Sequence, residues 1–281
     1  MKAYTSNNIR NIAVLGHGGK GKTTLCEAML YIAGASDRLG RVADGNTVLD
    51  FDSEEKRRKS SVSSAIAALE WDNTKLNIID APGLFDFEGG AAEAVRAAEA
   101  VLIVTSAGSG VDVGTEKAFR AAEKKGAAKF FAVTKTDSDH RNFYKTFDAL
   151  KEVYGNKLCP TIIPYMEGNI TKCYVNLMTG MAFSYDENGK ATKVPVPEDS
   201  VIEEMTSAFM EAVATTDDAL MEKFFEGEKF TKEEILKGLC IGIFDGSIYP
   251  VYAVSGLTCA GVDQLLYGLA WSAPGAFGYA G

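Results

Sequence analysis

The sequence predicts an α/β fold in which a mostly parallel sheet is flanked by helices and carries an inserted α+β subdomain. Three observations support this prediction. A glycine-rich loop near the N-terminus joins an apolar run to a helical pattern, and apolar runs then alternate with helical segments to about residue 155. The alternation breaks between residues 159 and 249 and then resumes. We therefore expect a main domain formed by residues 1–158 and 250–281, with residues 159–249 inserted into it.

The composition is that of an ordinary globular protein, with 46% hydrophobic and 24% charged residues in a chain of 281. No apolar run approaches the roughly 18 residues that a membrane span needs. A net charge of −9 argues against DNA binding. The five cysteines form neither a C-x-x-C pair nor a metal-ligand spacing. These features predict a cytoplasmic protein with reduced thiols and without a membrane or DNA partner, and we expect a monomer.

The glycine-rich loop, residues 16–23, fits the phosphate-binding pattern G-x-x-x-x-G-K-[ST]. It follows the apolar run Ile12–Leu15 and precedes residues 24–32, whose apolar side chains recur at helical spacing. Glycines let backbone N–H groups surround phosphates, and the N-terminus of a helix adds further donors. This context favours a P-loop over a glycine-rich turn without a ligand. The predicted nucleotide-binding residues of the loop are Gly16, His17, Gly18, Gly19, Lys20, Gly21, Lys22, Thr23 and Thr24.

A second phosphate-side motif follows the apolar run at residues 75–79. Residues 80–83 read D-A-P-G and fit D-x-x-G, a pattern that is weak alone but strong at a strand end after a P-loop. Lys22 should reach the outer phosphates, and the Thr23 hydroxyl should bind Mg²⁺. The Asp80 carboxylate can hold the Mg²⁺ shell, while Gly83 exposes an N–H to the γ-phosphate. We predict Lys22 and Gly83 as catalytic residues.

A polar stretch from residue 37 to 64 lies between the P-loop helix and the next apolar run. It reads as a solvated surface loop, and in a P-loop GTPase the first switch lies at this place. Such a switch brings a hydroxyl to Mg²⁺ and the γ-phosphate. The residues alone do not choose among the four candidate serines, Ser60, Ser61, Ser63 and Ser64.

Two later loops suit recognition of a guanine base. The strand predicted at residues 129–133 runs into Thr134-Lys135-Thr136-Asp137, a variant of N-K-x-D. The Asp137 carboxylate can accept from both adjacent donors of guanine, which adenine lacks. Lys135 would pack across the base, and Thr134 replaces an asparagine that braces the loop. After the strand predicted at residues 249–254, the backbone of Ser255, Gly256 and Leu257 can donate to the guanine carbonyl.

The interruption has the pattern of an α+β unit. Residues 174–186 and 191–197 predict two short strands around a hairpin turn, and residues 201–225 predict one long acidic helix. Residues 231–239 predict a second helix that begins with a capping box. The acidic helix face suits either solvent or a basic partner. Beyond the helix predicted at residues 261–271, we expect a frayed tail from residue 272 to 281.

Taken together, these loops resemble those of the G domain of bacterial elongation factor G, a P-loop GTPase with an inserted G′ subdomain. The resemblance runs from about residue 10 to 266. It rests on Gly16-His17, on the D-x-x-G loop followed by Asp86-Phe87, and on Thr134–Asp137. It also rests on residues 211–218 and 220–227 of the insertion.

This resemblance implies binding of GTP and GDP with Mg²⁺. Family members share Arg58 and place a switch threonine where Ser61 stands, so the resemblance assigns Ser61 to Mg²⁺ beside Thr23 and Asp80. In the family, the G′ subdomain faces stalk proteins of the large ribosomal subunit, which makes the ribosome the expected partner. Because the family continues into a β-barrel and further domains, we expect this chain to be a fragment.

Several positions depart from the family pattern. Leu84 stands where the family has a histidine that positions the attacking water, and Gly19 replaces a P-loop aspartate. The family sequence R-G-I-T is R-K-S-S here, at residues 58–61. The chain therefore resembles a diverged, elongation factor G-like paralogue with weakened or altered hydrolysis.

Two other functions stay open. A nucleotide-holding scaffold without efficient turnover would also explain Leu84. Residues 18–24 resemble the loop of partition-type ATPases, although His17 stands where those proteins carry a signature lysine, and the motif at residues 134–137 has no role in ATP recognition.

Overall fold

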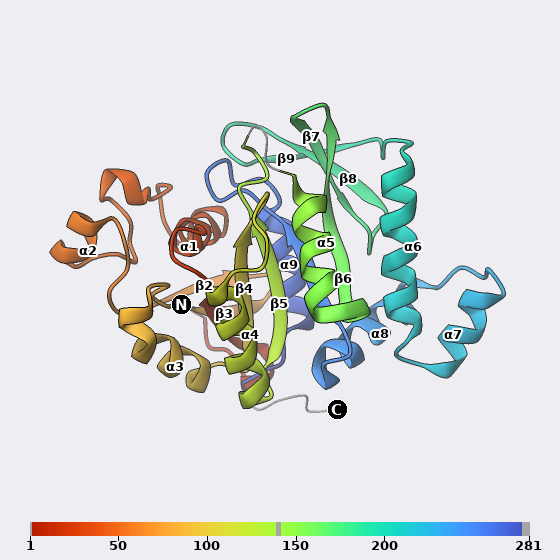
Figure 1. The fold of residues 1–281 in the computed structure, drawn as a ribbon, viewed down its shortest axis with the longest axis horizontal. Coiled ribbons are helices and arrows are strands. Elements are labelled where there is room, and N and C mark those ends of the chain that lie inside the picture. Colours follow the sequence, from red (N-terminus) through yellow and green to blue (C-terminus); the bar gives the residue numbers. More distant parts are fainter. Residues whose placement is uncertain (1, 139–141, 277–281) are drawn as a thin grey trace.

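The computed structural model describes residues 2–138 and 142–276, so His140 and residues 277–281 of the predicted tail lie outside it. Within this part, ten strands form one sheet in the order β2-β3-β1-β4-β5-β10-β6-β7-β8-β9 (Figure 1). The strands are β1 (Ile9–Leu15), β2 (Ala65–Trp71), β3 (Thr74–Asp80), β4 (Ala100–Ser106), β5 (Ala128–Thr134), β6 (Leu158–Glu167), β7 (Ile170–Asn176), β8 (Met181–Tyr185), β9 (Ala191–Val194) and β10 (Tyr249–Ala253).

The centre of the sheet is parallel and its two ends are antiparallel. Strands β3, β1, β4, β5, β10 and β6 run in one direction, β2 pairs antiparallel with β3, and β6 to β9 form an antiparallel meander. Strands β4 and β5 are buried along their whole length, as expected of central strands covered on both faces. This mixed, mostly parallel sheet confirms the predicted fold class.

Helices cover both faces of the sheet. α1 packs against α9, and both contact β3, whereas α3 lies on β1, α4 on β4 and β5, and α5 on β6. The helices are α1 (Lys22–Ile32), α2 (Ser53–Arg58), α3 (Glu88–Ala97), α4 (Val113–Lys125), α5 (Phe143–Tyr154), α6 (Ser200–Ala214), α7 (Asp218–Phe225), α8 (Lys232–Asp245) and α9 (Val262–Ser272). Among the described residues, no helix is long and apolar enough to cross a membrane.

Local sequence signals set where several helices begin. The Asn142 side chain accepts hydrogen bonds from two backbone N–H groups at the start of α5. The predicted capping box at the start of α8 is confirmed, because Thr231 and Glu234 each accept from the other's backbone N–H. Helix α4 ends at Lys125, and Gly126 follows it with a φ of 72°, which suits a residue without a Cβ.

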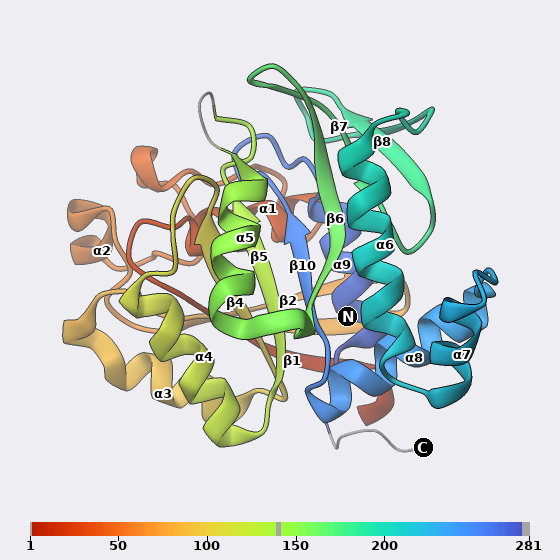
Figure 2. The same cartoon turned by 45° about the vertical axis from the view of Figure 1, so that its right-hand side comes forward.

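The inserted segment departs from the prediction at several points. The strand predicted at residues 174–186 is wrong, because this stretch holds the end of β7, a turn and β8, and the helix predicted at residues 231–239 continues to Asp245. The single helix predicted at residues 201–225 is wrong: α6 stops at Ala214, and α7 begins after Asp217, whose carboxylate caps it by accepting from the Ala219 N–H. Strand β6 was not expected, and it pairs parallel with β10. Figure 2 shows α6 lying along β6, with the hairpin strands beyond it. One sheet thus runs through the main domain and the inserted segment, and their division stays a prediction.

The tail beyond α9 is not frayed as far as it is described. Residues 273–275 are buried, and the backbone N–H of Ala276 donates to the Ile9 carbonyl at 3.2 Å. The reason is compositional, since small apolar residues here can pack against the first strand instead of entering solvent. All five cysteines are described and free.

Candidate functional site

The predicted site residues meet at one edge of the sheet. Strands β1, β3, β5 and β10 are all part of the parallel centre, so their carboxyl ends lie on the same side. The P-loop follows β1, the D-x-x-G loop follows β3, and the two base-side loops follow β5 and β10. At this edge is a cleft of about 170 Å³ whose lining includes Gly18, Lys22, Thr23, Gly83 and Lys135.

The P-loop backbone is held close to its neighbours. Gly16 has a φ of 143°, and a Cβ there would lie 2.2 Å from the Val104 carbonyl oxygen of β4. Gly19 and Gly21 also have positive φ angles, of 75° and 88°. Only glycine fits such a path without strain. The half-buried His17 shares this packing, because a Cβ on Gly114 would lie 2.5 Å from the His17 Cα.

Lys22 is buried within the P-loop. Its ammonium donates to the carbonyls of Gly16 and His17, each at 3.1 Å. Burial lowers the pKa of Lys22, and the nearby Asp80 carboxylate opposes that shift. A Cβ on Gly83 would lie 2.1 Å from the Lys22 Nζ and 2.8 Å from the Gly18 nitrogen. The structure thus brings the two predicted catalytic residues into contact, with no room for a side chain at position 83.

A buried polar cluster lies beside them. The Thr23 hydroxyl donates to the Asp80 carboxylate at 2.6 Å and lies 3.0 Å from the Ser61 hydroxyl, which donates to Asp50 at 2.7 Å. Burial raises the pKa of Asp80 to about 7, against the opposing effects of Thr23 and Lys22. Burial likewise raises the pKa of Asp50. The carboxylates of Asp50 and Asp80 are close together and buried, so a bound cation would offset their negative charge.

The donor set of this cluster fits Mg²⁺. One carboxylate oxygen of Asp80 and one of Asp50 are buried without a hydrogen-bond partner. Hydroxyl and carboxylate oxygens are the ligands that Mg²⁺ prefers, together with substrate phosphates and water. Among the described residues, no group of three or more His, Cys, Asp or Glu side chains could hold a metal by itself.

Asp50 is a site residue that the sequence did not single out. It lies in the segment predicted as a solvated loop, yet Asp50 and Ser61 are 3% and 9% exposed. The prediction is wrong for this part because buried carboxylates anchor the segment. Glu27 accepts from the backbone N–H groups of Val48 and Leu49, and the segment also forms α2. The sequence gives little signal, because Asp50 lies between Leu49 and Phe51 at the start of a densely charged stretch.

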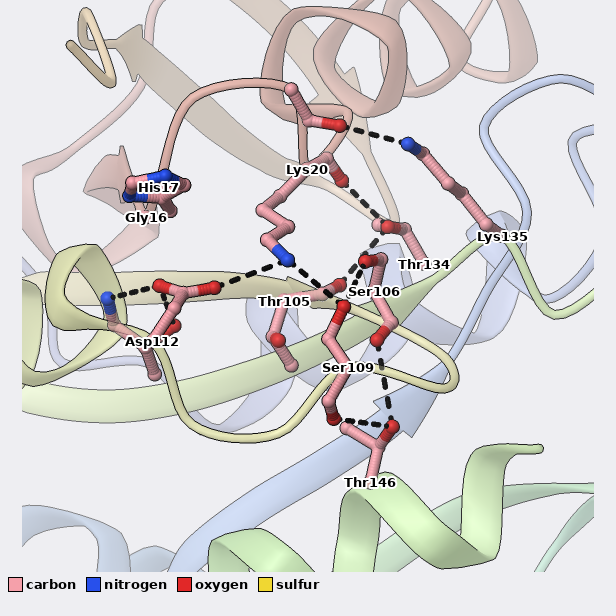
Figure 3. A network of polar contacts seen from close by, with 12 residues as sticks. Gly16, His17, Lys20, Thr105, Ser106, Ser109, Asp112, Thr134, Lys135 and Thr146 are labelled. Atoms are coloured by element: carbon pink, nitrogen blue, oxygen red, sulfur yellow. Dashed lines mark hydrogen bonds and ion pairs between the residues drawn. The ribbon is translucent and has the colours of Figure 1, made fainter. Parts of the chain in front are cut away.

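The P-loop and the loop after β5 are bonded to each other (Figure 3). The Thr134 hydroxyl donates to the Lys20 carbonyl at 2.6 Å, and the Lys135 ammonium donates to the Gly19 carbonyl at 2.8 Å. The Lys20 side chain points elsewhere: its ammonium donates to Ser109 at 2.9 Å and pairs with Asp112 at 3.2 Å. Lys20 can therefore offer its backbone N–H to a phosphate, while its side chain ties the P-loop to the start of α4.

The two loops predicted to face the base differ in exposure. Asp137 is exposed, and Lys135, with a φ of 60°, turns the chain ahead of it. In the loop after β10, Ser255 is fully buried and Leu257 is half exposed. A Cβ on Gly256 would lie 3.1 Å from backbone atoms of Thr24, so this loop packs directly on the start of α1.

Leu84 lies beside the cleft at the P-loop. It is 40% exposed, and its Cδ2 would lie 3.0 Å from a Cβ on Gly18. It also lines an apolar cavity of about 350 Å³, together with Pro82, Ala91 and Ala118. A leucine side chain has no hydrogen-bonding atom, so it cannot orient a water molecule.

Comparisons with known proteins agree with this geometry. Residues 7–274 match the family model of the elongation factor Tu GTP-binding domain. The chain belongs to this family. Membership of these GTP-binding domains supports binding of a guanine nucleotide, and it disfavours the partition-type ATPase alternative.

This GTP-binding domain has similar relatives. It is 33% identical over 261 residues to elongation factor G-like proteins from two strains of Mycobacterium tuberculosis, a match covering 92% of this chain and 36% of those proteins. A crystal structure of a protein from Thermus thermophilus aligns with a TM-score of 0.89 and 35% identity, covering 96% of this chain and 41% of that one.

Proposed function

We propose that this domain binds GTP and GDP with Mg²⁺ as the conformational switch of an elongation factor G-like translational GTPase. The observation that carries this proposal is the pair of hydrogen bonds joining the P-loop to the loop that carries Asp137. Phosphates held by the first loop would place the base beside the second. Family membership supports the same ligand.

Each predicted residue then has a role. The backbone of residues 16–24 and the Lys22 ammonium hold the phosphates, and Gly83 offers its N–H on the γ-phosphate side. Thr23, Ser61 and Asp80 would hold Mg²⁺, with Asp50 fixing Ser61. Asp137 accepts from guanine, while Lys135 and residues 255–257 border the base. The bound Mg²⁺ would neutralise phosphate charge.

Titration calorimetry with GTP, GDP and ATP tests this proposal. We expect GTP and GDP to bind more tightly than ATP, because only guanine offers Asp137 two donors. Chelation of Mg²⁺ should weaken GTP binding. Equal or tighter binding of ATP would refute the assignment of Asp137.

Slow hydrolysis follows from Leu84, which leaves no side chain to orient water beside Gly83. We expect Leu84→His to raise the rate of GTP hydrolysis by about 10-fold or more, at the low end of what a positioned general base contributes. Leu84→Ala serves as the control, since it removes the same apolar contact without adding a polar atom. Phosphate release in single turnovers measures both.

The second candidate function, a nucleotide-holding scaffold, is distinguished by the same variants. Similar phosphate release from Leu84→His and Leu84→Ala would contradict our interpretation of Leu84. Wild-type protein that binds GTP but releases no phosphate, with or without ribosomes, would favour the scaffold.

We further propose the ribosome as the partner, with its stalk proteins meeting the inserted segment. The elongation factor G-like relatives support a translational role. Helix α6 exposes Glu203, Glu204 and Glu211, an acidic surface suited to a basic partner. Cosedimentation of the full-length protein with ribosomes tests this, and cosedimentation independent of GTP would count against a switch.

A further inference from the structure

The inserted segment makes direct contact with the loop that carries Asp137. Strand β7 supplies both contacts. The Thr171 hydroxyl donates to the Thr136 carbonyl at 2.8 Å, and the Tyr174 hydroxyl lies 2.7 Å from the Thr136 hydroxyl. Thr136 and Tyr174 are 3% and 4% exposed, so water does not compete for the bond between their hydroxyls.

The direction of the hydroxyl pair follows from the neighbouring bond. The Thr136 hydroxyl also lies 3.0 Å from the Val254 carbonyl. Because a carbonyl can only accept, Thr136 donates its single hydroxyl proton to Val254. Tyr174 is therefore the donor to Thr136. Burial raises the pKa of Tyr174, and this keeps the donating proton in place at neutral pH. Thr136 thus links β7 to the end of β10.

Tyr174 is itself held in position. Its ring meets the Tyr185 ring edge-on at 5.5 Å between centroids, and the Tyr185 hydroxyl donates to the Asp263 carboxylate of α9 at 2.6 Å. A Cβ on Gly261 would lie 3.5 Å from the Tyr174 ring. With contacts on several sides, the phenol has little freedom to leave Thr136.

The loop after β5 needs such support. Lys135 adopts a left-handed conformation that is uncommon for a residue with a side chain. Thr134 braces the loop with a single hydroxyl, which bonds the carbonyls of Lys20 and Thr105. Asp137 follows Thr136 directly and is exposed, so Thr136 is the last firmly held residue before the carboxylate. A bidentate contact depends on the angle at which that carboxylate is presented.

We propose that Tyr174 is a positioning residue for guanine specificity, acting through Thr136 to aim the Asp137 carboxylate at the base. This inference rests on the proposed function. It gives the inserted segment a part in nucleotide selection, because its strand β7 fixes the loop that distinguishes guanine from other bases.

The test uses Tyr174→Phe, which removes only the hydroxyl, in the full chain. Binding of GDP, IDP and ADP is measured by competition with a fluorescent guanine nucleotide. IDP lacks the exocyclic amine, so the ratio of the IDP and GDP dissociation constants reports the second contact of Asp137. We expect this ratio to fall by about 3- to 10-fold, the range set by one neutral hydrogen bond. A purely structural role would weaken both nucleotides equally and leave the ratio unchanged.

Tyr185→Phe is the matched control, since it removes a partly buried tyrosine hydroxyl of the same segment that does not touch the loop, while it keeps the ring that packs against Tyr174. We expect it to keep the wild-type ratio. Thr136→Val should lower the ratio, and adding Tyr174→Phe to it should cause no further fall. A further fall, or an unchanged ratio in Tyr174→Phe, would overturn the proposal. Wild-type protein that bound ADP as tightly as GDP would instead refute the proposed function.

Discussion

Replacing Asp137 by asparagine is expected to weaken GDP binding by about 10²- to 10⁴-fold. The carboxylate can accept two hydrogen bonds from guanine, and each hydrogen bond to a charged group contributes about 1.5–3 kcal/mol. In Asp137→Asn, the charge is lost and an amide donor faces one of the guanine donors. Displacement of a fluorescent GDP analogue measures the change.

The same substitution should create a new preference. Xanthine carries a carbonyl where guanine carries its exocyclic amine, so the amide donor of Asp137→Asn matches it, and XDP should bind the variant more tightly than GDP does. Because Asp137 is exposed, we expect the free energy of unfolding of the nucleotide-free protein to change by no more than about 0.5 kcal/mol, as is usual for surface substitutions. Unaltered GDP affinity would mean that another group recognises the base.

Replacing Lys22 by methionine is expected to weaken GDP and GTP binding by about 30-fold or more. The substitution removes the ammonium that would pair with the phosphates, and the loss of one partner from a buried charge pair costs about 2–5 kcal/mol of binding free energy. Methionine fills a similar volume without the ammonium. The nucleotide-free fold should tolerate Lys22→Met, because burial already disfavours the charge there, as the lowered pKa of Lys22 shows.

Lys20→Met is the matched control for this prediction. Its ammonium bonds Ser109 and Asp112 on the side away from the cleft, so the loss of affinity should be much smaller than for Lys22→Met. Isothermal calorimetry at equal ionic strength compares the two variants. Equal losses would show that the phosphates depend on general positive charge and not on the position of the Lys22 ammonium.

The fold class and the placing of the loops could be predicted because the signals are local. A glycine loop between strand and helix, and motifs at strand ends, need no knowledge of distant contacts. The helix start at Thr231 followed from its capping box in the same way. The roles of the site residues stay predictions, although the structure places Lys22, Gly83, Thr23, Ser61 and Asp80 together.

The remainder depended on contacts between residues far apart in the chain. Asp50 looked like a solvated charge because its partner Ser61 lies 11 residues away and its burial depends on the P-loop. Strand β6 was missed because its pairing with β10 spans the whole insertion. The separate start of α7 depends on Asp217, whose short side chain could equally have faced solvent within one longer helix.

Main-chain pairing joins β10, β6, β7, β8 and β9 in one series, with register shifts between Val251 and Tyr252 and between Tyr165 and Met166. These strands are not joined by a hinge, because separating any neighbouring pair would break the backbone hydrogen bonds between them. A partner that binds the β8–β9 hairpin would therefore act through β7 and β6 on β10, the strand that leads into the loop at residues 255–257. We therefore expect binding of a partner at the outer hairpin to change how tightly the proposed site holds its nucleotide.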